Sequence, residues 1–176
     1  MLELLRGAAV VAATVTTGLV AGLFYTFSCS IMPGLGRLGD DAFIDAMRRV
    51  NAAILNGWFA ATFVGAPLLT GVAAALHLAG GAGGALPWAA AALVLHGVTL
   101  AVTFTVNVPL NEALDRALKT SDAAHEAESR ADSRRVRESF AGRWTRWNVI
   151  RALTSAAAFA CLAWSLVQYG QGLPPS

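Results

Sequence analysis

Three long stretches of the chain contain no Asp, Glu, Lys or Arg: Gly7 to Gly36, Val50 to Asn111 and Ala152 to Ser176. A bilayer core is about 30 Å thick and a helix rises about 1.5 Å per residue, so about 20 apolar residues make one crossing. A run of glycine ending in proline, residues 80–87, divides the middle stretch. The pattern predicts four membrane-spanning helices, at about residues 8–30, 56–78, 88–106 and 147–169.

The polar segment 37–55 has the pattern of an amphipathic helix. Asp40 or Asp41 can cap its start, because a carboxylate accepts hydrogen bonds from the first free backbone N–H groups. Apolar residues then recur at helical spacing: they are Phe43, Ile44, Met47, Val50 and Ile54. We expect a helix at the membrane interface.

The second polar segment, 107–146, predicts a helical stalk that continues into the last span. Apolar residues recur every four residues at Leu110, Leu114 and Leu118. Opposite charges follow at the same spacing, which stabilises a helix: the pairs are Glu126 with Arg130 and Arg134 with Glu138. An apolar stripe then leads into the last span through Val136, Phe140 and Trp144.

Composition supports a membrane protein, because 56% of the residues are hydrophobic, only 14% are charged and the mean hydropathy is +0.55. Soluble domains contain about 25% charged residues. Four spans and two polar segments fill the 176 residues, so we expect a single membrane domain over residues 1–176. The predicted fold class is all-α, an integral membrane four-helix bundle with two cytoplasmic helical loops.

The distribution of basic residues predicts the orientation. Eleven of the 13 Lys and Arg lie in residues 31–55 and 107–146, whereas only Arg6 lies on the opposite side. Because basic residues favour the cytoplasmic side, we expect a multi-pass protein of the cell membrane with both termini outside and both loops in the cytoplasm. Acidic residues are interleaved with these arginines, so we expect no binding of nucleic acid.

Polar side chains at membrane depth are candidate functional residues, because an unpaired polar group in hydrocarbon costs several kcal/mol. One face of the third span carries His96, Thr103, Asn107 and Asn111. One face of the fourth span carries Trp144, Trp147, Asn148, Arg151 and Ser155. Asn51 and Asn56 precede the second span on the same side of the membrane.

Arg151 is the strongest of these candidates, because it lies one turn inside the start of the fourth span. Its guanidinium can bind a phenolate or enolate oxygen, with Asn107 and Asn148 beside it. Structural roles stay open for the same residues. Arg151 can extend to lipid headgroups, the asparagines can join helices through hydrogen bonds, and His96 can be a neutral residue bonded to a carbonyl or a threonine.

The sequence predicts no metal site and no disulfide. His77, His96 and His125 fall at different depths or outside the spans, and no carboxylate lies within a span to complete a metal site. Cys29 is expected at the cytoplasmic end of the first span, whereas Cys161 is expected about 15 Å into the fourth.

Four segments occur in an order that identifies a family: residues 27–35 (FSCSIMPGL), 46–54 (AMRRVNAAI), 107–111 (NVPLN) and 144–151 (WTRWNVIR). They resemble the hallmark segments of the anthrone oxygenase-like family of four-span membrane proteins, also known as domain of unknown function 1772. The most specific are the Pro-x-Asn after the third span and the Trp-x-x-x-Asn-x-x-Arg that enters the fourth. The chain departs from the family's Met-Gln-Arg-Ile-Asn at 47–51, where it has Met-Arg-Arg-Val-Asn and keeps the asparagine.

The resemblance implies four helices in a bilayer and an activity known for relatives in aromatic polyketide pathways, the oxidation of anthrones to anthraquinones by dioxygen. We therefore expect a small apolar aromatic substrate and dioxygen as partners besides the lipid bilayer, with no metal or flavin cofactor. The predicted catalytic residues are Arg151 and Asn148, which stabilise an oxyanion, and His96. Either His96 or a water takes the carbon-bound proton. The predicted substrate-binding residues are Asn51, Asn107, Asn111, Trp144 and Trp147.

A non-enzymatic scaffold or small subunit is the alternative function. In this reading Asn107, Asn111, Asn148 and Arg151 form a structural polar lock between the third and fourth spans. A transporter has less support, because alternating access usually moves one internal repeat against another and the four spans show no internal repeat. The pair Gly18 and Gly22 lets another helix approach closely and suits a contact in a homo-oligomer.

Overall fold

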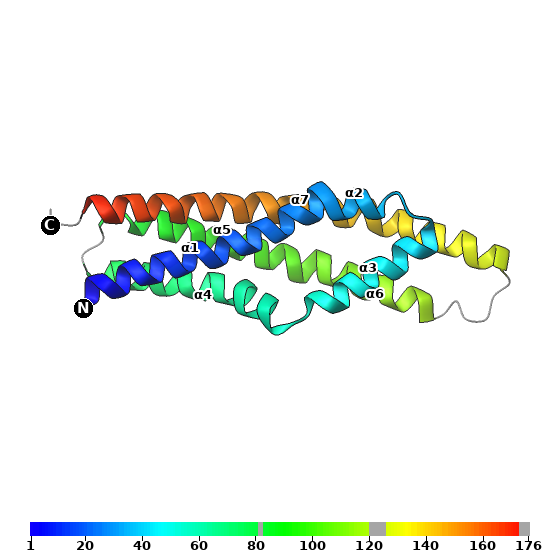
Figure 1. Ribbon diagram of the computed structural model, residues 1–176, viewed down its shortest axis with the longest axis horizontal. Coiled ribbons are helices and arrows are strands. Elements are labelled where there is room, and N and C mark those ends of the chain that lie inside the picture. The colour runs from blue at the N-terminus through cyan, green and yellow to red at the C-terminus, as the bar shows by residue number, and fades with distance from the viewer. Residues whose placement is uncertain (81–82, 120–125, 173–176) are drawn as a thin grey trace.

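The computed structural model describes residues 1–80, 83–119 and 126–172, and its long helices lie along one axis (Figure 1). The start of α1 and the end of α7 lie at the same end. In chain order the helical segments are α1 (Leu2–Thr26), η1 (Phe27–Ile31), α2 (Met32–Leu35), α3 (Asp40–Ile54), α4 (Gly57–Ala79), α5 (Leu86–Val102), η2 (Thr103–Asn107), α6 (Val108–Lys119) and α7 (Glu126–Gln171). No strand occurs among the described residues, which confirms the predicted all-α class.

Four of the described helical stretches are long and apolar enough to cross a membrane: Leu2–Leu35, Gly57–Ala79, Leu86–Ala117 and Ala131–Gln171. Helix α1 packs against α4 and α7, and α5 packs against the same two helices, so the four form a closed bundle. The prediction of a four-helix membrane bundle is therefore confirmed, and the chain is a multi-pass membrane protein.

The interior of the bundle is built from small side chains. Ala13, Ala73, Ala92 and Ala158 are fully buried, which lets the helix backbones approach closely. Large apolar side chains such as Leu153 instead point outward, where lipid chains solvate them in a membrane. Of the two predicted close-approach glycines, Gly18 lies against the Phe159 ring of α7, whereas Gly22 has open space beside it.

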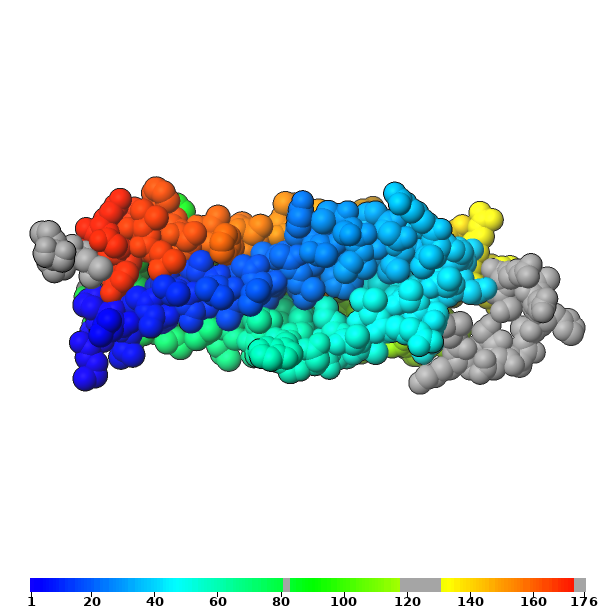
Figure 2. All heavy atoms as spheres, in the orientation of Figure 1, coloured from blue at the N-terminus to red at the C-terminus, as the bar shows by residue number. Residues whose placement is uncertain are grey.

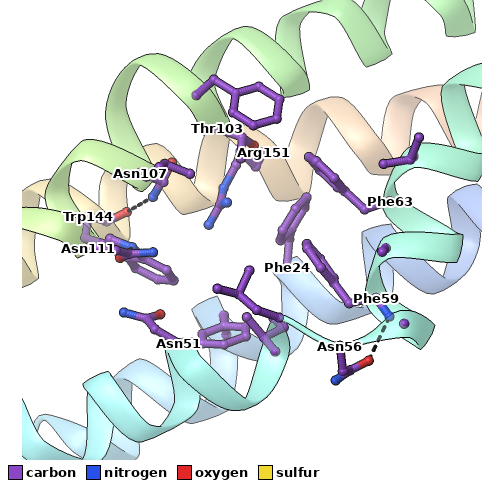
Figure 3. A pocket seen from close by; sticks show the side chains of 18 residues that line it. Phe24, Asn51, Asn56, Phe59, Phe63, Thr103, Asn107, Asn111, Trp144 and Arg151 are labelled. Atoms are coloured by element: carbon purple, nitrogen blue, oxygen red, sulfur yellow. Dashed lines mark hydrogen bonds between the residues drawn. The ribbon is translucent and has the colours of Figure 1, made fainter. Parts of the chain in front are cut away.

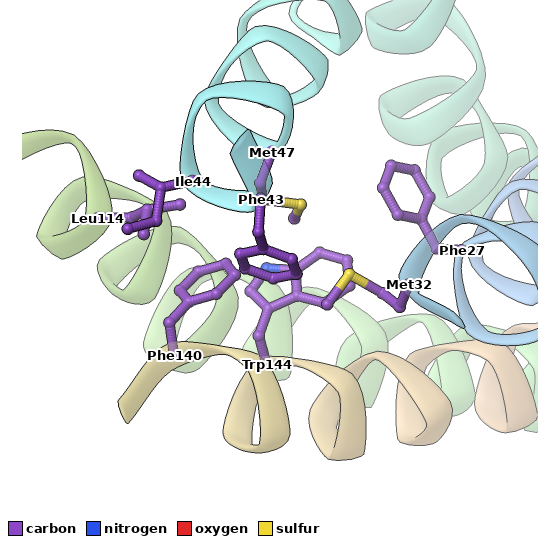
Figure 4. Close-up of a cluster of buried hydrophobic side chains, with 8 residues drawn as sticks. All are labelled: Phe27, Met32, Phe43, Ile44, Met47, Leu114, Phe140 and Trp144. Carbon is purple, nitrogen blue, oxygen red and sulfur yellow. The ribbon is translucent and has the colours of Figure 1, made fainter. Parts of the chain in front are cut away.

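A second core, made of large side chains, lies at the end of the bundle away from the termini (Figure 4). Here α3 packs against α6 and α7. Its buried members are Phe27, Met32, Phe43, Ile44, Met47, Leu114, Phe140 and Trp144. The face of α3 predicted from its apolar spacing is the face that this core buries.

The start of α3 differs from the prediction. Gly39, not Asp40 or Asp41, is the residue before the helix, and no side chain caps it. The Asp40 carboxylate instead accepts a hydrogen bond from Arg137 Nη1 at 2.8 Å. Arg137 also donates to the Gly36 and Leu38 carbonyls, at 2.7 Å each. The contact with α7 therefore outweighs a local cap.

The first and third spans continue as helices beyond the ends expected at residues 30 and 106, and each continues through a proline. Pro33 and Pro109 each follow a widened π-helical turn, η1 and η2, that ends two residues earlier. A proline ring clashes with the carbonyl four residues before it, and a widened turn relieves that clash. Residues 107–119 therefore continue the helix of the third span.

The predicted ion pair between Arg134 and Glu138 is present on the exposed face of α7, with 2.8 Å between Nε and Oε1. The side chains of the predicted pair Glu126 and Arg130 lie outside the described part of the structure. The same holds for the side chains of Leu118 and His125. Figure 2 shows that α1 and α3, from blue to cyan, cover much of one face of the bundle.

Candidate functional site

A cavity of about 470 Å³ lies where the membrane bundle meets the large-residue core (Figure 3). This volume is within the range of small-molecule sites. Its walls come from α1, η1, the end of α3, the start of α4, η2, α6 and α7. The lining residues are Phe24, Phe27, Asn51, Ile54, Leu55, Asn56, Gly57, Phe59, Ala60, Phe63, Val64, Thr103, Phe104, Asn107, Val108, Asn111, Trp144 and Arg151.

Arg151 supplies the one charged side chain among the lining residues. It is only 6% exposed, and its guanidinium carbon lies 4.3 Å from the centre of the Phe24 ring and 5.3 Å from that of Trp144. These cation–π contacts hold the guanidinium against two aromatic faces. Its Nε is buried and has no hydrogen-bond partner among the described residues. One donor of a buried cation is therefore unpaired.

No carboxylate neutralises this cation from the cavity wall. Asp and Glu are absent from residues 4–39, 46–111 and 139–176, and every lining residue comes from these stretches. A buried charge without a partner is costly, and an anionic ligand removes that cost. The cavity is thus suited to a ligand that carries negative charge on oxygen.

Asn148 holds Arg151 in place without lining the cavity. It is fully buried, and its Oδ1 accepts from Arg151 Nη2 at 2.7 Å. Its Nδ2 donates to the Phe24 carbonyl at 2.9 Å and to Ser28 Oγ at 2.8 Å. Asn148 therefore joins α7 to α1 and η1 while it orients the guanidinium.

The third span contributes two asparagines to the cavity wall. Asn107 is fully buried; its Nδ2 donates to the Trp144 carbonyl at 3.4 Å, and its Oδ1 has no partner among the described residues. Asn111 Oδ1 accepts from the Trp144 indole Nε1 at 2.8 Å. Within the described residues, two lining side chains therefore hold an unpaired polar atom, a donor on Arg151 and an acceptor on Asn107.

Of the predicted site residues, Arg151, Asn51, Asn107, Asn111 and Trp144 line the cavity. Trp147 is half-buried on α7 and Asn148 is buried behind Arg151, and neither lines the cavity. Asn56 caps α4 by accepting from the Phe59 backbone N–H at 3.0 Å.

His96 lies on the same helical stretch as Asn107 but not in the cavity. It is buried, and its Nε2 lies 3.2 Å from Thr17 Oγ1 on α1. The two residues are 11 positions apart, which corresponds to about 16 Å along a helix. Residues on one face of a helix can lie at different depths, so sharing a face with Asn107 does not bring His96 to the cavity. A catalytic role of His96 stays a prediction.

The aromatic wall of the cavity was not singled out from the sequence. Phe59 and Phe63 stack with 5.1 Å between ring centres, and Phe63 makes edge contacts with Phe24 at 6.3 Å and Phe104 at 6.4 Å. The four-residue spacing of Phe59 and Phe63 was the available signal, since it places both rings on one face of α4. These rings give the cavity flat apolar surfaces.

The cavity reaches the outer surface of the bundle. Among its lining residues, Val64 on α4 and Phe104 on η2 are 51% and 62% exposed, and Leu55 between α3 and α4 is 79% exposed. We name these three residues the rim. All three are apolar, so the opening suits contact with lipid chains rather than with water.

The chain was also compared with known proteins. The anthrone oxygenase family matches residues 56–161, which include Asn107, Trp144, Asn148 and Arg151 but not Phe24. No curated protein matches the chain. No solved structure matches it either. Because the matched stretch covers more than half of the sequence, the chain belongs to the anthrone oxygenase family.

Proposed function

We propose that the protein is an oxygenase that uses dioxygen to oxidise an anthrone-like aromatic polyketide to a quinone. The observation that carries this proposal is the buried guanidinium of Arg151 in an aromatic-lined cavity, whose Nε has no hydrogen-bond partner among the described residues and whose lining includes no carboxylate. Membership of the anthrone oxygenase family supports the reaction class.

Arg151 acts by stabilising charge on the substrate oxygen. An anthrone has a ketone whose enolate forms when a proton leaves the methylene carbon opposite it. A guanidinium that donates to this oxygen favours the enolate over the ketone, because the interaction strengthens as negative charge develops. Asn148 keeps the guanidinium oriented for this contact.

The oxidation balances without another reactant. The enolate carbon gives electrons to dioxygen and forms a carbon–oxygen bond, and protonation yields a hydroperoxide. Loss of the remaining hydrogen from that carbon, with cleavage of the oxygen–oxygen bond, gives the second carbonyl and one water. The electron-rich enolate is itself the reductant, so the proposal needs no metal or flavin.

The walls of the cavity account for binding of a flat aromatic substrate. Phe59, Phe63 and Trp144 offer aromatic faces. The free Oδ1 of Asn107 can accept from a substrate hydroxyl, while Asn51 and Asn111 supply further polar contacts at the wall. A substrate with both a carbonyl and a phenolic hydroxyl would satisfy both unpaired groups.

His96 and a water molecule are the two candidates to accept the carbon-bound proton. Because His96 does not line the cavity, we favour a water molecule. Trp147 lies outside the lining residues, so we assign the stacking surface on α7 to Trp144.

A structural module is the second candidate function, and the contacts of Asn148 favour it. Asn148 joins α7 to α1, while Asn107 joins η2 to α7 through the Trp144 carbonyl. These hydrogen bonds can serve the stability of the bundle alone.

We also infer that both termini lie outside the cell and that the polar segments lie in the cytoplasm. Eleven of the 13 basic residues lie in residues 31–55 and 107–146, and such residues favour the cytoplasmic side. The cavity then opens near the cytoplasmic end of the bundle.

Oxygen uptake by the purified protein in nanodiscs, with an anthrone added, tests the proposal. We expect uptake above the spontaneous rate of a protein-free sample, with the quinone as product. Arg151→Lys should lower the rate about 10- to 100-fold, because lysine cannot reproduce the oriented guanidinium. Arg134→Lys, on the exposed face of α7, is the matched control and should leave the rate unchanged.

The variants also separate the candidate functions. A rate equal to the protein-free sample, together with a lower unfolding temperature for Arg151→Lys, would support the structural module instead. His96→Ala should leave the rate unchanged if water accepts the proton, whereas a loss of activity without loss of stability would assign that role to His96.

A further inference from the structure

A second polar cavity, of about 360 Å³, lies at the end of the bundle that carries both termini. It is lined by residues from the start of α1, the end of α4, residues 83–85 before α5 and the end of α7. The residues that matter below are Arg6, His77, Gly80, Gly84, Gln168 and Tyr169. It shares no lining residue with the cavity around Arg151.

Two buried polar atoms at this cavity lack a hydrogen-bond partner among the described residues, Arg6 Nη2 and His77 Nε2. Arg6 is 8% exposed and His77 is 5% exposed. His77 Nδ1 lies 2.8 Å from the Ala73 carbonyl oxygen, and a carbonyl can only accept, so Nδ1 carries the proton. In the neutral imidazole Nε2 is then an acceptor. The cavity therefore lacks one acceptor for Arg6 and one donor for His77.

Charge argues for a neutral ligand group. Arg6 already forms an ion pair with Glu3 and donates from Nε to the Leu76 carbonyl at 3.0 Å. The paired carboxylate offsets the positive charge, so an anion gains little here. A hydroxyl group both accepts and donates, which is the combination that Arg6 Nη2 and His77 Nε2 require.

Glycine provides the space for this arrangement. A Cβ atom on Gly80 would lie 0.7 Å from Arg6 Nη2, and one on Gly84 would lie 2.7 Å from Gln168 Oε1. The Gly80 backbone has φ −105°, which any residue adopts, so it is the contact with Arg6 that excludes a side chain. The cavity is also much larger than one water molecule, whose share of liquid water is about 30 Å³.

The cavity lies at the level where lipid headgroups are expected. Trp88 and Trp164 contact each other edge to face near the same end, with 6.2 Å between ring centres, and both are exposed. Exposed tryptophans gather at the membrane–water interface. A hydroxyl-bearing headgroup can therefore reach the cavity while its acyl chains stay in the bilayer.

We propose that this second cavity binds a hydroxyl-bearing group of the polyol type, such as the glycerol of a lipid headgroup, between Arg6 and His77. The site is distinct from the proposed oxygenase site. Its occupant should brace the ends of α1, α4 and α7 by satisfying both buried polar atoms.

Native mass spectrometry of protein taken from mixed nanodiscs tests the proposal. The discs contain phosphatidylcholine with equal amounts of phosphatidylglycerol and phosphatidylmethanol, which have the same charge and differ in the glycerol hydroxyls. We expect the wild-type protein to retain phosphatidylglycerol in preference. Gly80→Ala, which displaces Arg6, and His77→Phe, which removes the acceptor, should each reduce this preference about tenfold, the effect expected for one or two buried hydrogen bonds.

Gly71→Ala is the matched control, because a Cβ on this glycine of α4, the helix that carries His77, meets no atom within 4 Å. It should retain the preference. Free glycerol distinguishes the source of the hydroxyls: if it raises the unfolding temperature of the wild-type protein but not of His77→Phe, the site also takes soluble polyols. No preference for either lipid together with no effect of glycerol, or a preference that both variants keep, would overturn the proposal and leave a cavity that holds water only.

Discussion

Asn148 shows how one amide can define the chemistry of a neighbouring charge. It accepts a hydrogen bond from Arg151 and donates to the Phe24 carbonyl and to Ser28. These three hydrogen bonds fix the Arg151 guanidinium relative to α1 and η1. Because the acceptor is an amide oxygen rather than a carboxylate, Arg151 is oriented but keeps its full positive charge. A carboxylate at this position would orient the guanidinium equally well and remove its attraction for a substrate oxyanion.

Asn148→Asp therefore tests whether the charge of Arg151 is used. The carboxylate should pair with Arg151 but cannot donate to the Phe24 carbonyl as the amide does, so we expect a folded protein with a lower unfolding temperature. Oxygen uptake should fall about 10- to 100-fold, because the neutralised guanidinium stabilises an enolate less well. Thermal unfolding and oxygen uptake on the same sample check this. An unchanged rate would show that the charge of Arg151 is not used.

Residue type and spacing in the sequence were enough to single out most of the polar residues that the cavity brings together. Arg151, Asn107 and Asn111 are rare polar residues in apolar stretches, and such residues need partners. The sequence did not show that His96 lies away from the cavity. Helical periodicity gives the direction of a side chain but does not identify its neighbour on another helix. The bond between Asn148 and the Phe24 carbonyl has no signal in the sequence, since any backbone carbonyl can accept.

At the scale of elements, the two π turns place the cavity residues. In an α-helix one residue occupies about 100° of rotation, so a turn with an extra residue changes which side chains face inward beyond it. Turn η2 carries Thr103, Phe104 and Asn107 into the cavity wall, and η1 begins at Phe27. The spans predicted from the sequence end at residues 30 and 106, just before the prolines that follow these turns. A local pattern cannot distinguish a helix end from a helix that widens, because packing in the bundle decides between them.

Replacement of Pro109 tests the role of η2. In Pro109→Ala the restored N–H can donate to the Thr105 carbonyl, so we expect the π turn to tighten towards an α-helix. Asn107 should then rotate within the cavity wall and the rate of oxygen uptake should fall about tenfold, while the unfolding temperature stays equal or rises. Pro87→Ala is the control, because a proline in the first turn of α5 lacks no helical hydrogen bond. Equal rates for both variants would show that the π turn does not position Asn107.

At the scale of the whole molecule, the bundle separates two polar ends. One end holds the cavity around Arg151 and the docked helix α3, and the other holds the cavity between Arg6 and His77. Four helices with small buried residues and large outward apolar residues connect them. This arrangement was predictable in outline, because charge-free stretches, glycines and prolines mark the spans in the sequence.

The inferred orientation can be measured with single cysteines in a background that carries Cys29→Ser and Cys161→Ser. A cysteine at the exposed residue Gln171, at the end of α7, should react with a membrane-impermeant maleimide in intact cells. A cysteine at the exposed residue Asp41, at the start of α3, should react only after the cells are opened. The reverse pattern would place both termini in the cytoplasm and contradict the inference.

The apolar rim of Leu55, Val64 and Phe104 has a consequence for enzyme kinetics. When a substrate enters from the bilayer, the reaction rate depends on the mole fraction of the substrate in the lipid. It does not depend on the substrate concentration in the whole sample volume. Empty liposomes added to a reconstituted sample should therefore dilute an anthrone and slow the reaction, although the total amounts of protein and substrate stay constant. Saturation curves from samples with different lipid contents should coincide only when the substrate is expressed per lipid.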